Sequence, residues 1–224
     1  DIDAKKLAKN IKAIQKLNAI LISPPYKIVD KVTDKYKLYN LLEKNNINCP
    51  KSYITKKNFF QDLKLKHIKY PVILKPRNGT SSILTLKANN KKEFNLFYKY
   101  LTQKISKSYF DKKSFKQKIL IQEYIKGTEF GLDLLNSLER KYFSYLLKQK
   151  IEMRNGETDV CKVSNIKISK LCKKISKLVL HNFLIDIDII LKKKKFYIID
   201  INPRIGGGYP FSHSAGFDMM KYLT

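Results

Sequence analysis

The sequence predicts an α+β protein in which antiparallel hairpins are combined with amphipathic helices. Apolar runs at 70–74 and 83–86 flank a turn of small residues, and runs at 185–191 and 196–201 flank four lysines. Each pair is typical of two strands joined as a hairpin. Apolar residues recur at helical spacing in 166–183. A chain of 224 residues is long enough for one large domain or two small lobes.

The first part of the chain predicts a helix, a short strand and a second helix. Apolar residues at helical spacing predict helices over 3–18 and 34–42, and the apolar run 19–22 predicts the strand between them. Asn90 precedes Glu93 by three residues, which is the spacing of a capping box, so a further helix is expected to start there.

The second part of the chain predicts mainly strands. Runs at 119–124, 130–135 and 142–147 have the length and the apolar content of strands, and Asn155-Gly156 is a hairpin turn. A last helix is expected to begin in 215–223.

The net charge of +27 comes almost entirely from lysine. The only arginines are Arg77, Arg140, Arg154 and Arg204. Readout of base edges favours the bidentate guanidinium group. The scarcity of arginine therefore argues against a specific nucleic-acid partner and predicts only weak, salt-sensitive adhesion to polyanions.

Several features favour a cytoplasmic protein without membrane contact. No apolar run approaches the ~20 residues of a membrane span, and no apolar segment of a signal peptide follows the first charges. Cys49, Cys161 and Cys172 form no CxxC pair, so neither a zinc site nor a disulfide framework is indicated. The chain does not begin with Met, and we expect it to be a fragment of a longer protein.

The segment FYIIDINPRIGGGYP at 196–210 carries the strongest chemical signal. Asp200 and Asn202 lie two residues apart on a strand, so their side chains share a face. Their oxygens suit Mg²⁺ or Mn²⁺. Arg204 adds a planar cation that can grip phosphate, and the glycines 206–208 let the backbone come close to a ligand.

A second metal ligand is expected on the neighbouring strand. Asp188 precedes Asp200 by twelve residues, and a hairpin of that size brings the two positions side by side. Two carboxylates this close repel each other unless a cation lies between them. Asp186 shares a face with Asp188 and is the alternative ligand. The competing interpretation is an exposed polar edge of an antiparallel sheet.

Five segments, in this order, resemble the ATP-grasp superfamily, and especially its carbamoyl-phosphate-synthase-like branch. They are DKYKLYNLL (34–42), VILKPRNGTSS (72–82), IQEYIKGTEFGLDLL (121–135), RNGET (154–158) and IDINPRIGGGYPFSHSAG (199–216). The resemblance implies an ATP-grasp fold, in which two α/β lobes clasp ATP. Residues 31–124 would form the N-terminal lobe and 125–224 the C-terminal lobe, with 1–30 as the remnant of a preceding domain.

The resemblance also implies contacts to the phosphates of the nucleotide. Lys75 resembles the lysine that contacts the α and β phosphates, and Lys35 resembles the first nucleotide-contacting basic residue. The alternative for Lys75 is one more solvated lysine. The flexible flap over the phosphates would consist of Gly79, Thr80, Ser81 and Ser82.

The adenine and ribose contacts follow from the same resemblance. Glu123, Tyr124 and Ile125 resemble the hinge that holds adenine through backbone groups and a carboxylate. Glu129 resembles the acid that accepts the ribose hydroxyls. The alternative for both carboxylates is an ordinary strand end on a solvated face.

Two arginines are the candidate catalytic residues. Arg204 would contact the transferred phosphoryl group, and Arg154 resembles a basic residue that reaches the same place. Lys148 and Lys150 stand where relatives often carry arginine, which puts phosphate contacts at these two positions in doubt.

The resemblance implies an ATP- and Mg²⁺-dependent ligase acting on a small-molecule carboxylate and an amine. The γ-phosphoryl group would pass to the carboxylate, and an amine or other nucleophile would then displace phosphate. Two alternatives stay open. One is a non-catalytic ATP-binding module or fragment of a larger synthetase, and the other is a basic nucleic-acid-binding protein.

Overall fold

The protein is α+β, as predicted, with its strands in two antiparallel sheets. The computed structural model describes residues 2–79, 84–106, 118–154 and 156–222. The chain divides into two compact units, of which unit 1 comprises 1–33 with 127–224 and unit 2 comprises 34–126. Residues 1–33 therefore share a unit with the C-terminal part of the chain. Their origin as a remnant of a preceding domain stays a prediction.

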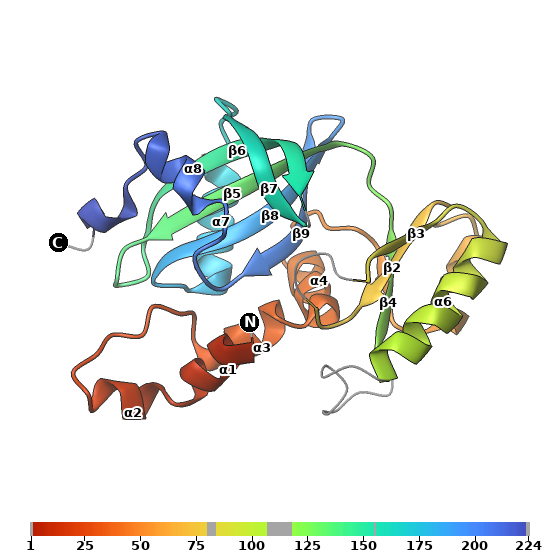
Figure 1. Cartoon of the computed structure of the whole chain (residues 1–224), viewed down its shortest axis with the longest axis horizontal. Helices are drawn as coiled ribbons and strands as arrows, with labels where there is room; N and C mark the ends of the chain where they lie inside the picture. The colour runs from red at the N-terminus through yellow and green to blue at the C-terminus, as the bar shows by residue number, and fades with distance from the viewer. Residues whose placement is uncertain (1, 80–83, 107–117, 155, 223–224) are drawn as a thin grey trace. The chain divides into compact units, whose positions relative to one another are not determined.

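Unit 2 is built on a four-stranded sheet with the order β1-β4-β2-β3. The first strand of the predicted hairpin is confirmed as β2, and it pairs antiparallel with β3. The second strand was expected over 83–86 but begins only at Leu86, and residue 83 lies outside the described residues. Helix α6 packs against β2, β3 and β4 (Figure 1). The elements of unit 2 are α4 (Lys35–Lys44), β1 (Ser52–Tyr53), α5 (Lys56–Lys64), β2 (Val72–Pro76), β3 (Leu86–Ala88), α6 (Lys91–Ser106) and β4 (Ile119–Glu123).

The core of unit 2 is an aromatic cluster between the helices and this sheet. Phe59 of α5 and Phe94 of α6 are fully buried and stacked, with ring centroids 4.9 Å apart and an interplanar angle of 13°. The predicted capping contact between Asn90 and Glu93 forms at the start of α6, while the Glu93 carboxylate bonds the backbone one residue before Asn90. The Glu93 N–H donates to Asn90 Oδ1 at 3.0 Å, and Glu93 Oε2 accepts from the Asn89 N–H at 2.9 Å.

Unit 1 contains a five-stranded antiparallel sheet with the order β7-β6-β5-β8-β9. Side chains alternate between the two faces of each strand, so that Leu132, Leu134 and Ile187 share one buried face. Helix α7 packs against β5 and β6 (Figure 1). The elements of unit 1 are α1 (Ile2–Lys9), α2 (Ile11–Gln15), α3 (Tyr26–Val32), β5 (Thr128–Asn136), β6 (Tyr142–Arg154), β7 (Glu157–Val163), α7 (Ser169–Val179), β8 (Phe183–Lys192), β9 (Lys195–Asn202), α8 (Tyr209–Ser214) and the 3₁₀ helix η2 (Met219–Tyr222).

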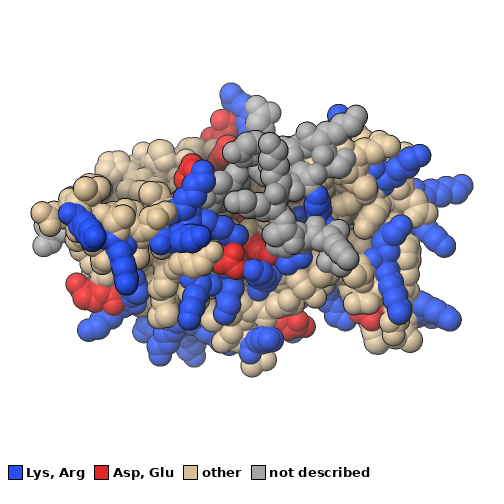
Figure 2. All heavy atoms as spheres, turned by 90° about the horizontal axis from the view of Figure 1, so that it is seen from below, with Lys and Arg blue, Asp and Glu red and all other residues tan. Residues whose placement is uncertain are grey.

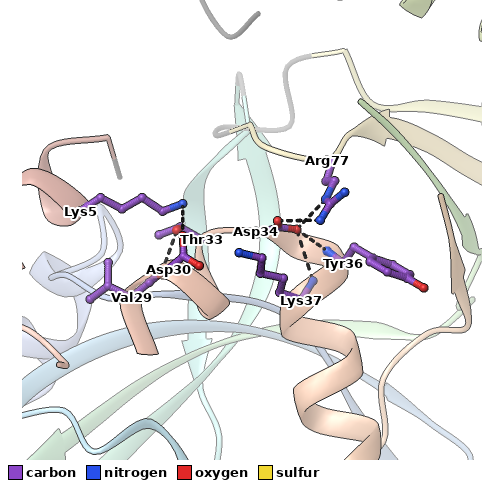
Figure 3. Close-up of polar contacts among 8 residues, drawn as sticks. All are labelled: Lys5, Val29, Asp30, Thr33, Asp34, Tyr36, Lys37 and Arg77. Carbon is purple, nitrogen blue, oxygen red and sulfur yellow. Dashed lines mark hydrogen bonds and ion pairs between the residues drawn. The ribbon is translucent and has the colours of Figure 1, made fainter. Parts of the chain in front are cut away.

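The N-terminal segment differs from the prediction. The helix expected over 3–18 is two short helices, α1 and α2, and the strand expected at 19–22 does not form. This segment is held by a side chain instead of a sheet. Asn182 Oδ1 accepts from the Ser23 N–H at 2.8 Å, and Asn182 Nδ2 donates to Leu21 O at 3.0 Å. Lys5 of α1 pairs with Asp30 of α3 at 3.1 Å (Figure 3).

The C-terminal segment also differs from the prediction, which placed a helix beginning in 215–223. Helix α8 covers Tyr209–Ser214, before the expected segment, and within residues 215–222 the short 3₁₀ helix η2 covers Met219–Tyr222. Gly216 has a φ of +86°, and its N–H donates to His213 O at 2.9 Å. A glycine with positive φ just after the last turn is a common way for a helix to end, which separates α8 from η2.

The lysine excess lies on the surface. Lys and Arg side chains are spread across the face shown in Figure 2, with Asp and Glu between them. This distribution fits the interpretation of lysine as a general solvent-facing residue. Among the described residues, no helix combines the length and the apolar character that crossing a bilayer requires.

Replacing Phe94 by Ala is expected to lower the free energy of unfolding of unit 2 by about 3–5 kcal/mol, because a stacked, buried ring is lost. The matched control is Leu96→Ala on the same helix, where the side chain is 64% exposed and the loss should stay below about 0.5 kcal/mol. Urea unfolding followed by circular dichroism measures both. Equal losses for the two variants would contradict the described core.

A buried histidine in unit 1 predicts acid sensitivity. His181 Nε2 lies 3.2 Å from Leu134 O, and Asn136 Nδ2 lies 3.4 Å from His181 Nδ1, contacts that suit a neutral imidazole. Burial lowers the pKa of His181 to about 4 from its ordinary 6.5, with the bond to Leu134 acting in the opposite direction.

The unfolded chain therefore binds this proton at a higher pH than the native protein does. The contribution of His181 to stability should be present above about pH 6.5 and lost as the pH falls toward 4, on the order of 3 kcal/mol in total. Urea unfolding at several pH values should show a steeper acid loss for the wild type than for His181→Gln. Parallel pH profiles of the two proteins would refute this.

Candidate functional site

One face of the unit 1 sheet collects carboxylates from three strands. Asp186 of β8 pairs with Asp133 of β5 on one side and with Asn202 of β9 on the other. Asp188 pairs directly with Asp200. The predicted placement of Asp188 beside Asp200 is therefore confirmed, and Asn202 lies on the same face one pleat away.

Lys150 partly compensates this negative charge. Its ammonium group lies 2.5 Å from Asp188 Oδ1, and the side chains are 12% and 34% exposed. Burial acts to lower the pKa of Lys150, but the charges of Asp188, Asp186 and Glu129 outweigh it and raise that pKa. Lys150 is thus held in its charged form by the acidic face.

Asp186 is the least compensated carboxylate of this face. Asn202 Nδ2 donates to its Oδ2 at 3.0 Å. Removal from water, followed by the neighbouring charges of Asp188 and Asp133, raises the pKa of Asp186 well above its usual range. An additional cation near Asp186 and Asp188 would relieve this repulsion.

Lys148 of β6 forms a buried cluster around Asp133, the β5 residue that pairs with Asp186. Its ammonium group donates to the Asp133 carboxylate, to Gly208 O at 2.8 Å and to Ser212 Oγ at 2.7 Å. The Ser212 hydroxyl also donates to Asp133. These acceptors match the three protons of an ammonium group. Lys148 therefore fastens α8 and the glycine turn to the sheet.

The glycine turn is packed closely against the acidic face. A Cβ atom at Gly206 would lie 2.5 Å from Asp186 Cγ, and one at Gly207 would lie 2.7 Å from Glu157 Oε2. The expected role of these glycines is close approach to a ligand. At Gly206 the close neighbour is the Asp186 side chain, so this glycine is required for packing of the turn on the sheet.

The residues present fit a magnesium ion. Asp188, Asp200 and Asn202 offer carboxylate and amide oxygens, which are the ligands that Mg²⁺ prefers. Among the described residues, no group of three or more His, Cys, Asp and Glu side chains is placed to hold a metal. Mg²⁺ is usually bound by one or two carboxylates with water and phosphate completing its shell, which agrees with such an incomplete protein set.

The two candidate catalytic arginines, Arg154 and Arg204, are exposed residues of unit 1. The Arg204 N–H donates to Asn202 O at 2.8 Å, and its guanidinium group donates to Ile205 O at 2.9 Å. Arg154 at the end of β6 pairs with Asp159 of β7 at 2.5 Å. Their contacts to a phosphoryl group stay predictions.

In unit 2, Lys75 is not a solvated lysine. Its side chain lies on β2, the residue is only 7% exposed, and the ammonium group donates to the Tyr39 hydroxyl of α4 at 3.3 Å. The Lys35 ammonium group donates to Gly79 O at 3.1 Å. Thr80, Ser81 and Ser82, the remaining residues of the expected flap, lie outside the described residues.

The expected adenine hinge follows β4. The Glu123 N–H donates to Lys51 O at 2.8 Å, and the Glu123 carboxylate accepts from the Lys51 N–H at 3.3 Å. The Lys87 ammonium group lies 4.3 Å from the centre of the Tyr124 ring, and Ile125 is buried. These contacts fix the backbone of the segment, and its role in binding adenine stays a prediction.

Glu129, the expected ribose-binding acid, is exposed on β5 of unit 1, opposite Ile190. This exposure agrees equally with ribose binding and with a solvated carboxylate. The ribose contact therefore stays a prediction.

Sequence reasoning missed two buried ion pairs. Asp133 and Lys148 form one of them in unit 1, and Asp34 and Arg77 form the other in unit 2. Asp133 is a single carboxylate inside the apolar run of β5, a pattern that signals a buried charge in need of a partner. Asp34 stands just before a helical pattern, which signals a helix N-cap but does not identify Arg77.

The acidic strand end and the Pro-Arg-Ile-Gly-Gly-Gly turn that follows it lie in the part of the chain that matches a known family. The sequence matches the model of the ATP-grasp domain over residues 32–208. The chain therefore belongs to the ATP-grasp family.

Curated relatives include two kinds of ligase or synthase. The chain is 29% identical over 188 residues to the D-alanine--D-alanine ligase of Petrotoga mobilis, covering 75% of this chain and 56% of the relative. It is 24% identical over 212 residues to the carbamoyl phosphate synthase large chain of Thermoanaerobacter sp., covering 90% of this chain and 19% of the relative. The chain thus spans about half or less of the length of these proteins.

Solved structures support the same fold. The biotin carboxylase domain of the Hydrogenobacter thermophilus 2-oxoglutarate carboxylase, in complex with MgADP, ADP and bicarbonate, superposes with a TM-score of 0.76 at 17% identity. That match covers 97% of this chain and half of the other. The D-alanine--D-alanine ligase of Bacillus anthracis complexed with ATP gives a TM-score of 0.64 at 15% identity, covering 95% of this chain and 70% of the other.

Replacing Lys148 by Met should lower the free energy of unfolding of unit 1 by about 3–5 kcal/mol, because the fully buried Asp133 would lose its compensating charge. Lys150→Met is the matched control on the same strand. Its partner Asp188 is 34% exposed and can be hydrated, so about 1 kcal/mol or less is expected. Urea unfolding of both variants tests this, and an equal loss would contradict the fastening role of Lys148.

Proposed function

We propose that this chain is the ATP-binding part of a Mg²⁺-dependent ligase that activates a carboxylate as an acylphosphate and passes the acyl group to an amine. The pairing of Asp188 with Asp200, beside Asn202 and the turn that carries Arg204, is the observation on which this rests. Family membership supports it, and so do the ligase and synthase relatives.

Each unit contributes its own group of contacts in this proposal. In unit 2, Lys35 and Lys75 bind the nucleotide phosphates, and the segment 123–125 binds adenine. The burial of Lys75 supports this role, since a lysine held against Tyr39 has lost most of its conformational freedom before a ligand arrives.

In unit 1, Glu129 binds the ribose, and Arg204 and Arg154 bind the transferred phosphoryl group. A guanidinium group suits this task because its planar donors match phosphate oxygens in pairs.

Asp188, Asp200 and Asn202 hold Mg²⁺, which neutralises phosphate charge when it is bound. The residues themselves mainly position the reactants and compensate charge, as in other phosphoryl transfers. The carboxylate oxygen of the substrate attacks the γ-phosphorus, the bond to the β-γ bridging oxygen breaks, and ADP leaves. The amine then attacks the acyl carbon and inorganic phosphate departs. No side-chain nucleophile is required.

Asp200→Asn and Asp188→Asn are expected to weaken binding of ATP in the presence of Mg²⁺ by at least about tenfold, equivalent to about 1.4 kcal/mol. Binding in EDTA should change much less, because the lost charge acts through the metal. Isothermal titration calorimetry with and without Mg²⁺ separates the two effects. Glu139→Gln, an exposed carboxylate in the β5–β6 loop, is the control and should bind like the wild type.

Unchanged Mg²⁺ dependence in both aspartate variants would refute the metal assignment. Phosphate release, screened over small carboxylates and amines, tests turnover. Binding of ATP without release under any combination would favour the non-catalytic module, and Mn²⁺ in place of Mg²⁺ would show whether the site accepts both ions.

A further inference from the structure

The start of α4 is joined to the end of β2 by a buried ion pair within unit 2. Arg77 Nε donates to Asp34 Oδ1 at 2.8 Å, and Arg77 Nη2 donates to Asp34 Oδ2 at 2.9 Å (Figure 3). The two residues are 8% and 1% exposed. Two parallel bonds fix the angle as well as the distance between the groups, so this contact orients the backbone on both sides.

Asp34 has a second task at the same place. Its Oδ1 also accepts from the N–H groups of Tyr36 and Lys37 at 3.2 and 3.3 Å, which caps the first turn of α4 (Figure 3). A carboxylate at a helix start is favourable both as a cap and against the helix dipole. The Arg77 guanidinium group is therefore attached to the end of the helix itself.

Two further contacts run between the same elements. The Lys35 N–H donates to Arg77 O at 3.2 Å, and the Lys35 ammonium group donates to Gly79 O at 3.1 Å. The Arg77 N–H donates to Lys118 O at 2.8 Å, just before β4. The carbonyl groups of Arg77 and Gly79 thus bind Lys35 of α4, while the N–H of Arg77 binds the residue that precedes β4.

Lys75 is held by the same helix. Its ammonium group contacts the Tyr39 hydroxyl, one turn along α4 from Lys35. Alternate residues 75, 77 and 79 therefore all contact α4, and Arg77, the middle one, carries the bidentate bond. Lys35 and Lys75, the two proposed phosphate lysines, lie on the two elements that this bond joins.

We propose that Asp34 and Arg77 are positioning residues for nucleotide phosphate binding, which set Lys35 and Lys75 in a fixed arrangement without touching the nucleotide. This inference rests on the proposed function. In this proposal Asp34 and Arg77 determine how strongly the protein prefers ADP to AMP, although neither residue contacts the nucleotide.

Substitutions can separate the effect of the Asp34–Arg77 ion pair from the effect of Asp34 as the N-cap of α4. Asp34→Asn keeps a side-chain oxygen for the helix N-terminus but removes the charge opposite Arg77. Arg77→Lys keeps the charge but loses the fork. The double variant Asp34→Asn with Arg77→Gln leaves no buried unpaired charge, so it keeps the test usable where a single variant fails to fold. Lys44→Gln, at the exposed far end of α4, is the control.

The measurement is the ratio of the dissociation constants for AMP and ADP, by calorimetry. The ratio should fall by about tenfold in Asp34→Asn and in Arg77→Lys, because the β-phosphate loses its aligned lysines while the adenosine contacts remain. The double variant should lose no more than the larger single loss, since both changes break one interaction. Lys44→Gln should keep the wild-type ratio.

Three outcomes decide between the explanations. A purely structural role would weaken AMP and ADP binding by the same factor and leave the ratio unchanged, which overturns the proposal. Additive losses in the double variant would also overturn it, because the two residues would then act separately. If the wild type binds neither nucleotide, the proposed function itself fails, and the positioning role fails with it.

Discussion

A charge removed from water must find a partner of opposite sign, and each unit of this protein is organised around one such pair. In unit 1, Asp133 is fully buried and Lys148 compensates it. In unit 2, Asp34 is buried and Arg77 compensates it. In both pairs the partner that supplies the cation also fastens a loop, so the cost of desolvation is offset while the loop gains a defined position.

The face of the unit 1 sheet that carries Asp133, Asp186, Asp188 and Asp200 stays acidic because its carboxylates are not all paired with cations. Lys148 serves Asp133 and Lys150 serves Asp188, but Asp186 has only an amide donor from Asn202 among the contacts described. A site for a divalent cation is expected where carboxylates are close together, partly hydrated and not fully paired, and the rows of Asp186 and Asp188 meet these conditions.

The sequence predicted the parts of the site that depend on local periodicity. The prediction that Asp188 lies beside Asp200 is confirmed, but the pairing depends on a β-bulge between Asp188 and Ile189. The register of the hairpin turn alone would place Asp188 opposite Ile199. The ion pairs could not be predicted from local periodicity, since Arg77 is 43 residues from Asp34 and Lys148 is 15 residues from Asp133. Helix α8 was missed because it is only six residues long and is fastened by the contact of Ser212 with Lys148, which the local sequence pattern does not show.

The choice between lysine and arginine explains why these two pairs are built differently. Lys148 meets three acceptors that surround one nitrogen, which suits an ammonium group and would leave a guanidinium group badly matched. Arg77 meets one carboxylate with two parallel donors, which an ammonium group cannot do. In a chain that uses lysine for almost every positive charge, an arginine therefore indicates a position where geometry matters as well as charge. Arg77 meets this criterion through its bidentate bond, and the position of Arg204, directly after the acidic strand end, makes it the next residue to which the same reasoning applies.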